Sequence, residues 1–120
     1  MSFLVVAEEP ATYERWVARQ QRPRGGPASE REAAGEQVFM RSCAGCHAIR
    51  GTEAQGTKGP DLSDFGSRRT IGAVAVPNTR AHLAGWIANS QTIKPGNLMP
   101  PVPLGSDELL NLVEYLENQR

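Results

Sequence analysis

The sequence predicts an all-α domain with long loops, preceded by a short strand and a helix. Apolar residues recur at helical spacing in several separate segments of the chain. Glycine and proline, with 12 and 9 occurrences, cluster between these segments and indicate extended loops. Only 39% of the residues are hydrophobic. A domain with so small a core commonly needs a metal, disulfides or a cofactor to complete it.

The N-terminal part, residues 1–22, is predicted to be an appendage. Residues 3–7 are apolar and partly β-branched, which favours a short strand. A helix is expected over 10–20, because proline suits its first position and its larger apolar residues form one stripe. Residues 23–28 are rich in proline and glycine and are interpreted as a linker. The main domain then covers residues 29–120.

Three helices are predicted within the main domain, each with a polar residue that can cap its N-terminus. Ser29 opens a capping-box pattern before the first helix. Asn78 or Thr79 can cap the second, and Ser106 or Asp107 can cap the last. The predicted bounds are 29–42, 80–89 and 106–118. The loops between these helices are long for a compact domain, so we expect them to pack on something besides protein.

Two cysteines and a histidine follow the first of these helices directly. The run Cys43-Ala44-Gly45-Cys46-His47 has the spacing C-x-x-C-H. Two thiols at this spacing can form thioethers with the two vinyl groups of one porphyrin, and the next imidazole can then bind the iron. The motif predicts one covalent haem c, with His47 as the proximal ligand.

Three other interpretations of the cysteines are weaker. A thioredoxin-like redox pair belongs in a βαβ setting, which this pattern of helices does not offer. A zinc site would need more ligands, and His82 is the only other histidine. A disulfide between Cys43 and Cys46 would close a very small ring.

An electron carrier with six-coordinate iron needs a second axial ligand. The candidates are Met1, Met40, Met99 and His82. Met40 lies within one helical turn of Cys43, so it cannot reach the opposite face of the haem. Met99 lies in a proline-rich loop, whose stiffness can hold a weakly binding thioether on iron. We expect Met99 to be the ligand; if it only packs, the iron has an open position.

With these motifs the chain resembles a class I cytochrome c from residue 29 to about residue 119. Gly59-Pro60-Asp61-Leu62 matches the family segment whose proline carbonyl accepts the hydrogen bond of the proximal histidine. Trp86 resembles the family's tryptophan near the haem propionates, although a core tryptophan is the alternative. The residues that match the crossing of the family's terminal helices are Gly35, Phe39, Leu112 and Tyr115.

The chain is also similar to the cytochrome c domain fused to subunit II of caa-type haem-copper oxidases. The similar segments are 46–52, 68–70, 77–79 and 94–97. This resemblance implies that Arg69 and Asn97 contribute to the haem site. It also implies that residues 1–22 are a remnant of the preceding dinuclear-copper domain. The copper-binding cysteines and histidines of that domain are absent, so no copper site is expected within this chain.

The predicted function is one-electron transfer by a His/Met-ligated haem c. In the resembled oxidases the haem receives electrons from a respiratory donor, such as a cytochrome bc-type complex, a small cytochrome or another redox protein. It passes them to the dinuclear copper centre of its own subunit. The chain alone is expected to catalyse nothing, whereas the parent complex would be a cytochrome c oxidase. The alternatives are a free-standing soluble periplasmic cytochrome c and a haem sensor or enzyme with an open iron position.

Charge and hydropathy restrict the partners and the location. A formal net charge of zero argues against a nucleic-acid partner. Because the chain has only two lysines, we expect the surface that docks a redox partner to be mainly apolar. The candidates for that surface are Ala44, Ile49, Val102 and Leu104. No segment approaches the ~20 apolar residues of a membrane span. Covalent haem attachment implies the extracytoplasmic side of the bacterial membrane, yet residues 3–7 are too short for the apolar region of a signal peptide. We therefore expect a segment of a larger exported or membrane-anchored protein. A mature form without its leader is the alternative.

Overall fold

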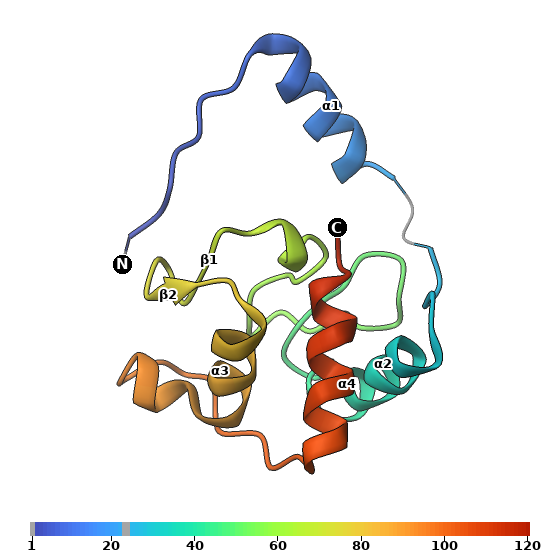
Figure 1. The fold of residues 1–120 in the computed structure, drawn as a ribbon, viewed down its shortest axis with the longest axis vertical. Helices are drawn as coiled ribbons and strands as arrows, with labels where there is room; N and C mark the ends of the chain where they lie inside the picture. Colours follow the sequence, from blue (N-terminus) through green and yellow to red (C-terminus); the bar gives the residue numbers. More distant parts are fainter. Residues whose placement is uncertain (1, 23–24) are drawn as a thin grey trace.

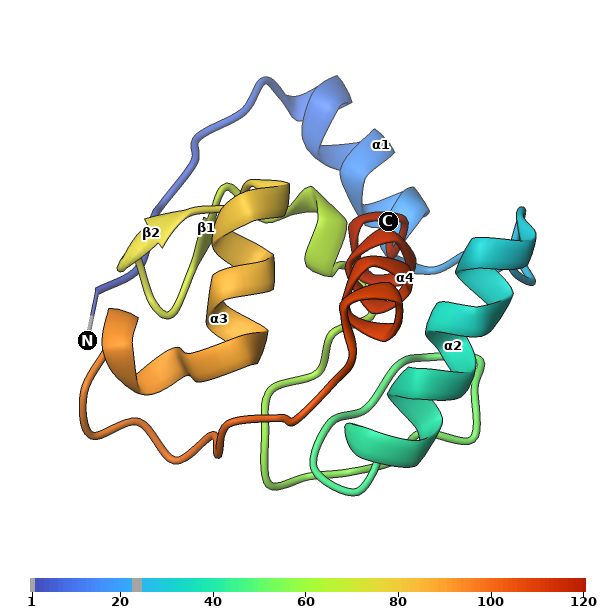
Figure 2. The ribbon, with the colours of Figure 1, turned by 60° about the horizontal axis from the view of Figure 1, so that its bottom comes forward.

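The computed structural model describes residues 2–22 and 25–120 (Figure 1). Its elements are α1 (Pro10–Gln20), α2 (Glu30–Ser42), the 3-10 helix η1 (Phe65–Ser67), β1 (Thr70–Ile71), β2 (Val76–Pro77), α3 (Arg80–Ile93) and α4 (Ser106–Glu117). Helices α2, α3 and α4 form the body of the molecule, and α1 projects from it (Figures 1 and 2). The predicted helical architecture is therefore confirmed for the main domain. None of the helices in the described ranges is long and apolar enough to cross a membrane.

The centre of the body is the crossing of α2 and α4. A Cβ atom on Gly35 would lie 2.1 Å from the carbonyl oxygen of Asn111, so only glycine allows the two backbones to come this close. One turn further along α2, the fully buried rings of Phe39 and Tyr115 pack with their centroids 5.6 Å apart. This is the helix crossing that the family resemblance predicts. It holds the end of α2, and with it the cysteine motif, against the core.

The N-terminal caps agree with the sequence at two helices and differ at the third. The Ser29 side chain accepts a hydrogen bond from the backbone of Glu32 at 3.0 Å, as the capping-box pattern predicts. Thr79 caps α3. At α4 the prediction is wrong, because the N-cap is Gly105 rather than Ser106 or Asp107. Here the carboxylate of Glu108 reaches back and accepts the Gly105 N–H at 3.0 Å, which supplies the missing cap from within the first turn.

Helix α1 has the predicted bounds, but the strand predicted over residues 3–7 is wrong. These residues have no regular structure, and Phe3 and Val5 are each 83% exposed. A strand needs a neighbour to satisfy its backbone groups, and no described segment pairs with this one. Part of the predicted linker, residues 23–24, lies outside the described residues. The division into appendage, linker and main domain stays a prediction.

Two features between η1 and α4 are absent from the sequence prediction. Strands β1 and β2 pair antiparallel over two residues each, too few to show a periodicity. Helix α3 extends to Ile93, but Asn89 has φ −160° and ψ 88° and breaks it, so its regular part ends near the predicted boundary. The short turn after this break faces the loop that carries Met99 (Figure 2).

Candidate functional site

The cysteine motif is folded into one tight turn at the C-terminus of α2. Cys43 is the C-cap residue and donates its N–H to Phe39 at 2.8 Å. The N–H groups of Cys46 and His47 both donate to the Cys43 carbonyl, at 3.0 and 2.9 Å. The two cysteines are not bonded to each other; Cys43 is half-buried and Cys46 is exposed. The turn therefore presents two thiols and an imidazole together, as the C-x-x-C-H chemistry requires.

The environment of Cys43 argues against a redox-active cysteine pair. Burial, together with the neighbouring Cys46, raises the pKa of the Cys43 thiol to about 11. A reactive redox pair needs a thiolate at neutral pH, and hence a lowered pKa. Cys43 has the opposite environment, and no βαβ unit surrounds it among the described elements.

The His47 ring is oriented by the segment Gly59–Pro60. Its Nδ1–H donates to the carbonyl oxygen of Pro60 at 2.8 Å, the contact that the resemblance implies. The backbone of Gly59 lies flat against the ring, since a Cβ atom there would be 2.5 Å from His47 Cε1. With Nδ1 used in this bond, Nε2 keeps the lone pair that can bind a metal.

Hydrogen bonds hold the backbone of Met99 on both sides, at its N–H within its own loop and at its carbonyl from the end of α3. Its N–H donates to Asn97 Oδ1 at 2.9 Å, and its carbonyl oxygen lies 3.0 Å from Ser90 Oγ. The Gln91 side-chain nitrogen donates to the carbonyls of Asn97 and Met99, at 2.7 and 3.3 Å. Sequence reasoning attributed the stiffness of this loop to its prolines and missed Ser90 and Gln91. Their role could have been suspected from the sequence, because Ser90 and Gln91 are polar residues that follow the apolar face of α3.

Replacing Asn97 with alanine should loosen this loop. The change leaves the Met99 N–H without its acceptor and removes two other hydrogen bonds, to Ser90 and Lys94. We expect a loss of about 1–2 kcal/mol in the free energy of unfolding, measured by urea denaturation. The matched control is Asn118→Ala at the exposed end of α4, which should change little. Equal effects of the two changes would contradict the assigned role of Asn97.

Trp86 and Arg69 lie near the two-stranded hairpin. The Trp86 ring packs on Gly72, where a Cβ atom would be 2.5 Å from Cζ3. Lys94, at the start of the Met99 loop, donates its Nζ–H to the Gly72 carbonyl at 2.7 Å. Among the described residues, the Trp86 indole N–H and the Arg69 guanidinium have no hydrogen-bond or ion-pair partner. Both donors are free for an anionic group such as a haem propionate.

The residues around this site fit a haem. Several apolar side chains pack against the buried core and are themselves only partly buried, which suits contact with a large apolar ring. They are Cys43, Ala44, Val76, Trp86, Val102 and Leu104. The donor set also fits, since His47 offers Nε2 to an iron and two thiols stand next to it in the same turn.

The sequence model of the cytochrome c family matches residues 32–120. The chain belongs to the cytochrome c family. Membership implies a covalently bound haem c, as the cysteine motif predicts. The curated relatives carry the name cytochrome c oxidase subunit 2. The protein from Alkalihalophilus pseudofirmus is 34% identical over 98% of this chain and 34% of its own length. That from Bacillus subtilis is 30% identical over 98% of this chain and 34% of its own length.

A third relative, from Bacillus sp. (strain PS3), is 33% identical over 87% of this cytochrome and 31% of its own length. The cytochrome thus spans about a third of the length of the curated relatives it matches. The expected likeness to the cytochrome c domain of oxidase subunit II is confirmed.

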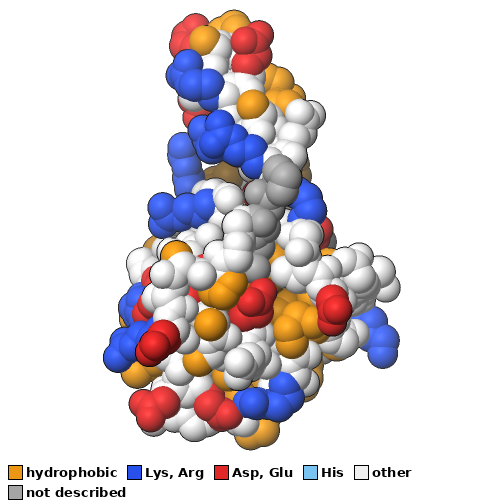
Figure 3. Space-filling view, turned by 90° about the vertical axis from the view of Figure 1, so that its right-hand side faces the viewer, with side chains coloured by type: hydrophobic (Ala, Val, Ile, Leu, Met, Phe, Trp, Pro, Cys, Tyr) orange, Lys and Arg blue, Asp and Glu red, His pale blue; other side chains and the backbone are white. Residues whose placement is uncertain are grey.

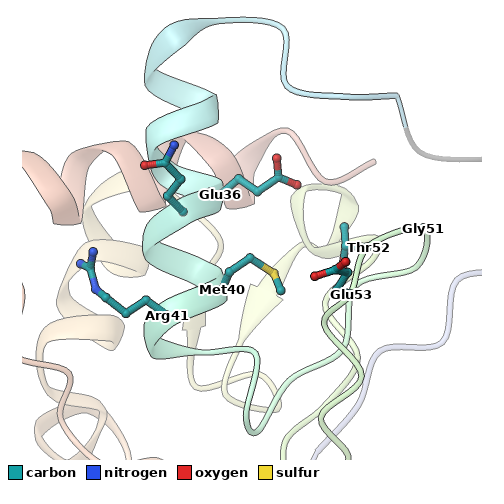
Figure 4. A pocket seen from close by; sticks show the side chains of 7 residues that line it. Glu36, Met40, Arg41, Gly51, Thr52 and Glu53 are labelled. Atoms are coloured by element: carbon teal, nitrogen blue, oxygen red, sulfur yellow. The ribbon is translucent and has the colours of Figure 1, made fainter.

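Two of the other candidate ligands of this cytochrome c, Met40 and His82, have different surroundings from Met99. Met40 points to a surface pocket of about 680 Å³ between α2 and the turn Gly51–Glu53 (Figure 4). His82 lies in the first turn of α3 with Nδ1 2.9 Å from Thr79 Oγ1. Met1 lies outside the described residues. Within the described ranges no three His, Cys, Asp or Glu side chains gather as a possible metal site.

One residue predicted for the docking surface of the cytochrome is wrong. Ile49 is fully buried in the core and is not accessible to a partner. Ala44, Val102 and Leu104 are half-buried at the edge of the core, and their role in docking stays a prediction. Leu98, next to the candidate ligand Met99, is 98% exposed and was not predicted.

Proposed function

We propose that this cytochrome c transfers single electrons through a haem ligated by His47 and Met99. The observation that carries the proposal is the pair of prepared ligands. The imidazole is fixed by Pro60 with Nε2 free, and the methionine loop is fastened to α3 by Ser90 and Gln91. When bound, the haem supplies the one-electron Fe(III)/Fe(II) couple.

The residues of the chain set the conditions for that couple. Cys43 and Cys46 hold the cofactor in place, and the Pro60 carbonyl makes His47 a stronger donor. A thioether ligand such as Met99 raises the reduction potential relative to a second imidazole. The His47 ring is held by the Pro60 carbonyl, and the backbone of Met99 is held by side chains of its own loop and of α3, so both residues can stay in position in either oxidation state.

In the complete protein, this domain would accept electrons from a respiratory donor and pass them to a dinuclear copper centre of the same subunit. The names of the relatives support this assignment, since all three are called cytochrome c oxidase subunit 2. The same relationship, with the covalent attachment of haem, supports a location of the domain on the extracytoplasmic side of the bacterial membrane. Residues 1–22 would then be the end of the copper domain and residues 23–28 the linker.

Optical spectroscopy of the oxidised, haem-loaded chain tests the proposed ligation. A thioether bound to Fe(III) gives a characteristic charge-transfer band, and we expect this band in the wild-type protein. If the band is absent while the haem is covalently attached, Met99 is not a ligand. The iron would then have an open position, and a role in ligand binding would replace electron relay.

Association with the electron donor should depend only weakly on salt. The chain has two lysines, Lys58 and Lys94, and cannot form a ring of lysines around the haem. The exposed Leu98 provides apolar surface next to the ligand loop instead. We expect the second-order rate of electron transfer to change by less than about twofold between low and physiological ionic strength. A loss of about tenfold or more would indicate charge-steered docking and contradict this view.

A further inference from the structure

The appended helix α1 touches the body of the molecule through its C-terminal end. None of its residues, all within the described part of the chain, is buried. A helix of 11 residues is marginal by itself in water, so this contact matters for its position. Figure 3 shows basic side chains along the projecting α1 lobe and at its junction with the body. The residues that line the crevice at this junction are charged or polar: Arg19, Arg22, Arg50, Ser63, Asp64 and Arg120.

Arg50 of the body binds the last residue of α1. Its guanidinium donates to the backbone carbonyl of Gln20 and also lies 3.3 Å from Asp64 Oδ2. The last carbonyls of a helix have no partner within the helix, and the helix dipole favours a cation at this end. Arg50 thus supplies the C-terminal cap of α1 from a loop 30 residues further along the chain.

Asp64 completes a closed set of contacts. With its amide turned so that the nitrogen faces the carboxylate, Gln20 donates to Asp64, with Oδ1 at 3.2 Å. Gln20, Arg50 and Asp64 therefore each contact the other two. The carboxylate is the better shielded of the two charged groups, with 24% of its side chain exposed against 46% for Arg50.

Arg50 and Asp64 lie in two loop segments that hydrogen bonds join just after the haem-attachment motif. The backbone N–H of Arg50 donates to Ser63 Oγ at 2.7 Å, and that of Leu62 donates to Ala48 at 2.8 Å. These bonds join the segment just after His47 to the segment just after Pro60. The crevice at the junction encloses only about 20 Å³, about the space of one water molecule. The contact between α1 and the body is therefore close, and its residues follow shortly after His47, the proposed iron ligand.

We propose that Gln20, Arg50 and Asp64 form a latch that holds α1 in a fixed orientation on the cytochrome domain. In the complete subunit, α1 then acts as a bracket that sets how the haem faces the preceding copper domain. The latch itself follows from the contacts within this chain. The bracket role rests on the proposed function.

Limited trypsin digestion of the haem-loaded chain tests the latch. Cleavage of the Arg19–Gln20 bond requires α1 to open, so its rate reports the open population. Arg50→Gln and Asp64→Asn should each raise this rate by about three- to fivefold. The matched control is Arg41→Gln, which removes another exposed ion pair, to Glu108 at 2.6 Å, without touching α1. If the latch variants are cleaved no faster than the control, the latch is overturned.

The bracket role is tested in the complete subunit with its copper centre loaded. The latch variants should slow electron transfer from haem to copper while the reduction potentials of both centres stay unchanged. An unchanged rate, together with faster trypsin cleavage, would overturn the bracket role and leave the latch standing. The charge-transfer band of the oxidised protein reports ligation by Met99 and does not depend on α1. It therefore shows whether the proposed ligation fails, separately from any failure of the latch.

Discussion

Replacing Gly35 with alanine should destabilise the folded chain by about 3 kcal/mol. The added methyl group would lie 2.1 Å from the carbonyl oxygen of Asn111 and 2.7 Å from Tyr115 Cβ. Neither neighbour can turn away as the end of a long side chain could, so α2 and α4 have to separate. The loss is measurable as a lower midpoint of urea denaturation, followed by far-UV circular dichroism.

Gly85→Ala is the matched control for this change. Gly85 is an exposed position inside α3, where a Cβ atom would meet only Ile93 Cδ1, at 3.9 Å. Alanine is the better helix former, so this variant should be more stable than the wild type by about 0.5–1 kcal/mol. Similar behaviour of the two variants would show that the helix crossing does not depend on glycine.

Met99→Ala should have the largest effect on the redox properties. Loss of the thioether removes the charge-transfer band of the oxidised protein. It should also lower the reduction potential by a few tenths of a volt, within the roughly 0.8 V range that axial ligation can span. Absorption spectroscopy and a potentiometric titration measure the two effects.

Met40→Ala serves as the control for the loss of a methionine. Met40 faces the surface pocket beside Gly51 and lies outside the cysteine turn (Figure 4). This variant should keep both the band and the potential of the wild type. A band that survives Met99→Ala, or disappears in Met40→Ala, would mean that the assigned ligand is wrong.

The parts of the fold that follow from local rules could be predicted from the sequence. The apolar stripe of α4 gave its position, and Ser29 gave the start of α2, because a capping box satisfies its bonds within four residues. The cap at Gly105 was missed for two reasons. Ser106 and Asp107 are better capping residues by type, and the observed cap depends on Glu108 reaching back to the Gly105 N–H.

Features that depend on contacts between distant segments were harder to predict. The strand over 3–7 had the right composition, but strand formation also requires a neighbour. The roles of Ser90 and Gln91 depend on a loop that returns to α3 after the helix has ended. Arg50 resembles any surface arginine in the sequence, and only the fold brings it to the end of α1.

The break in α3 at Asn89 affects the position of the proposed iron ligand Met99. Because the backbone leaves helical geometry there, Ser90 and Gln91 lie where they can hold the carbonyl of Met99. A straight helix would gain regular backbone bonds but carry these two side chains away from the loop. Substitutions that straighten α3 would therefore appear first as a change in colour and potential, while the helical content of the protein rises only slightly.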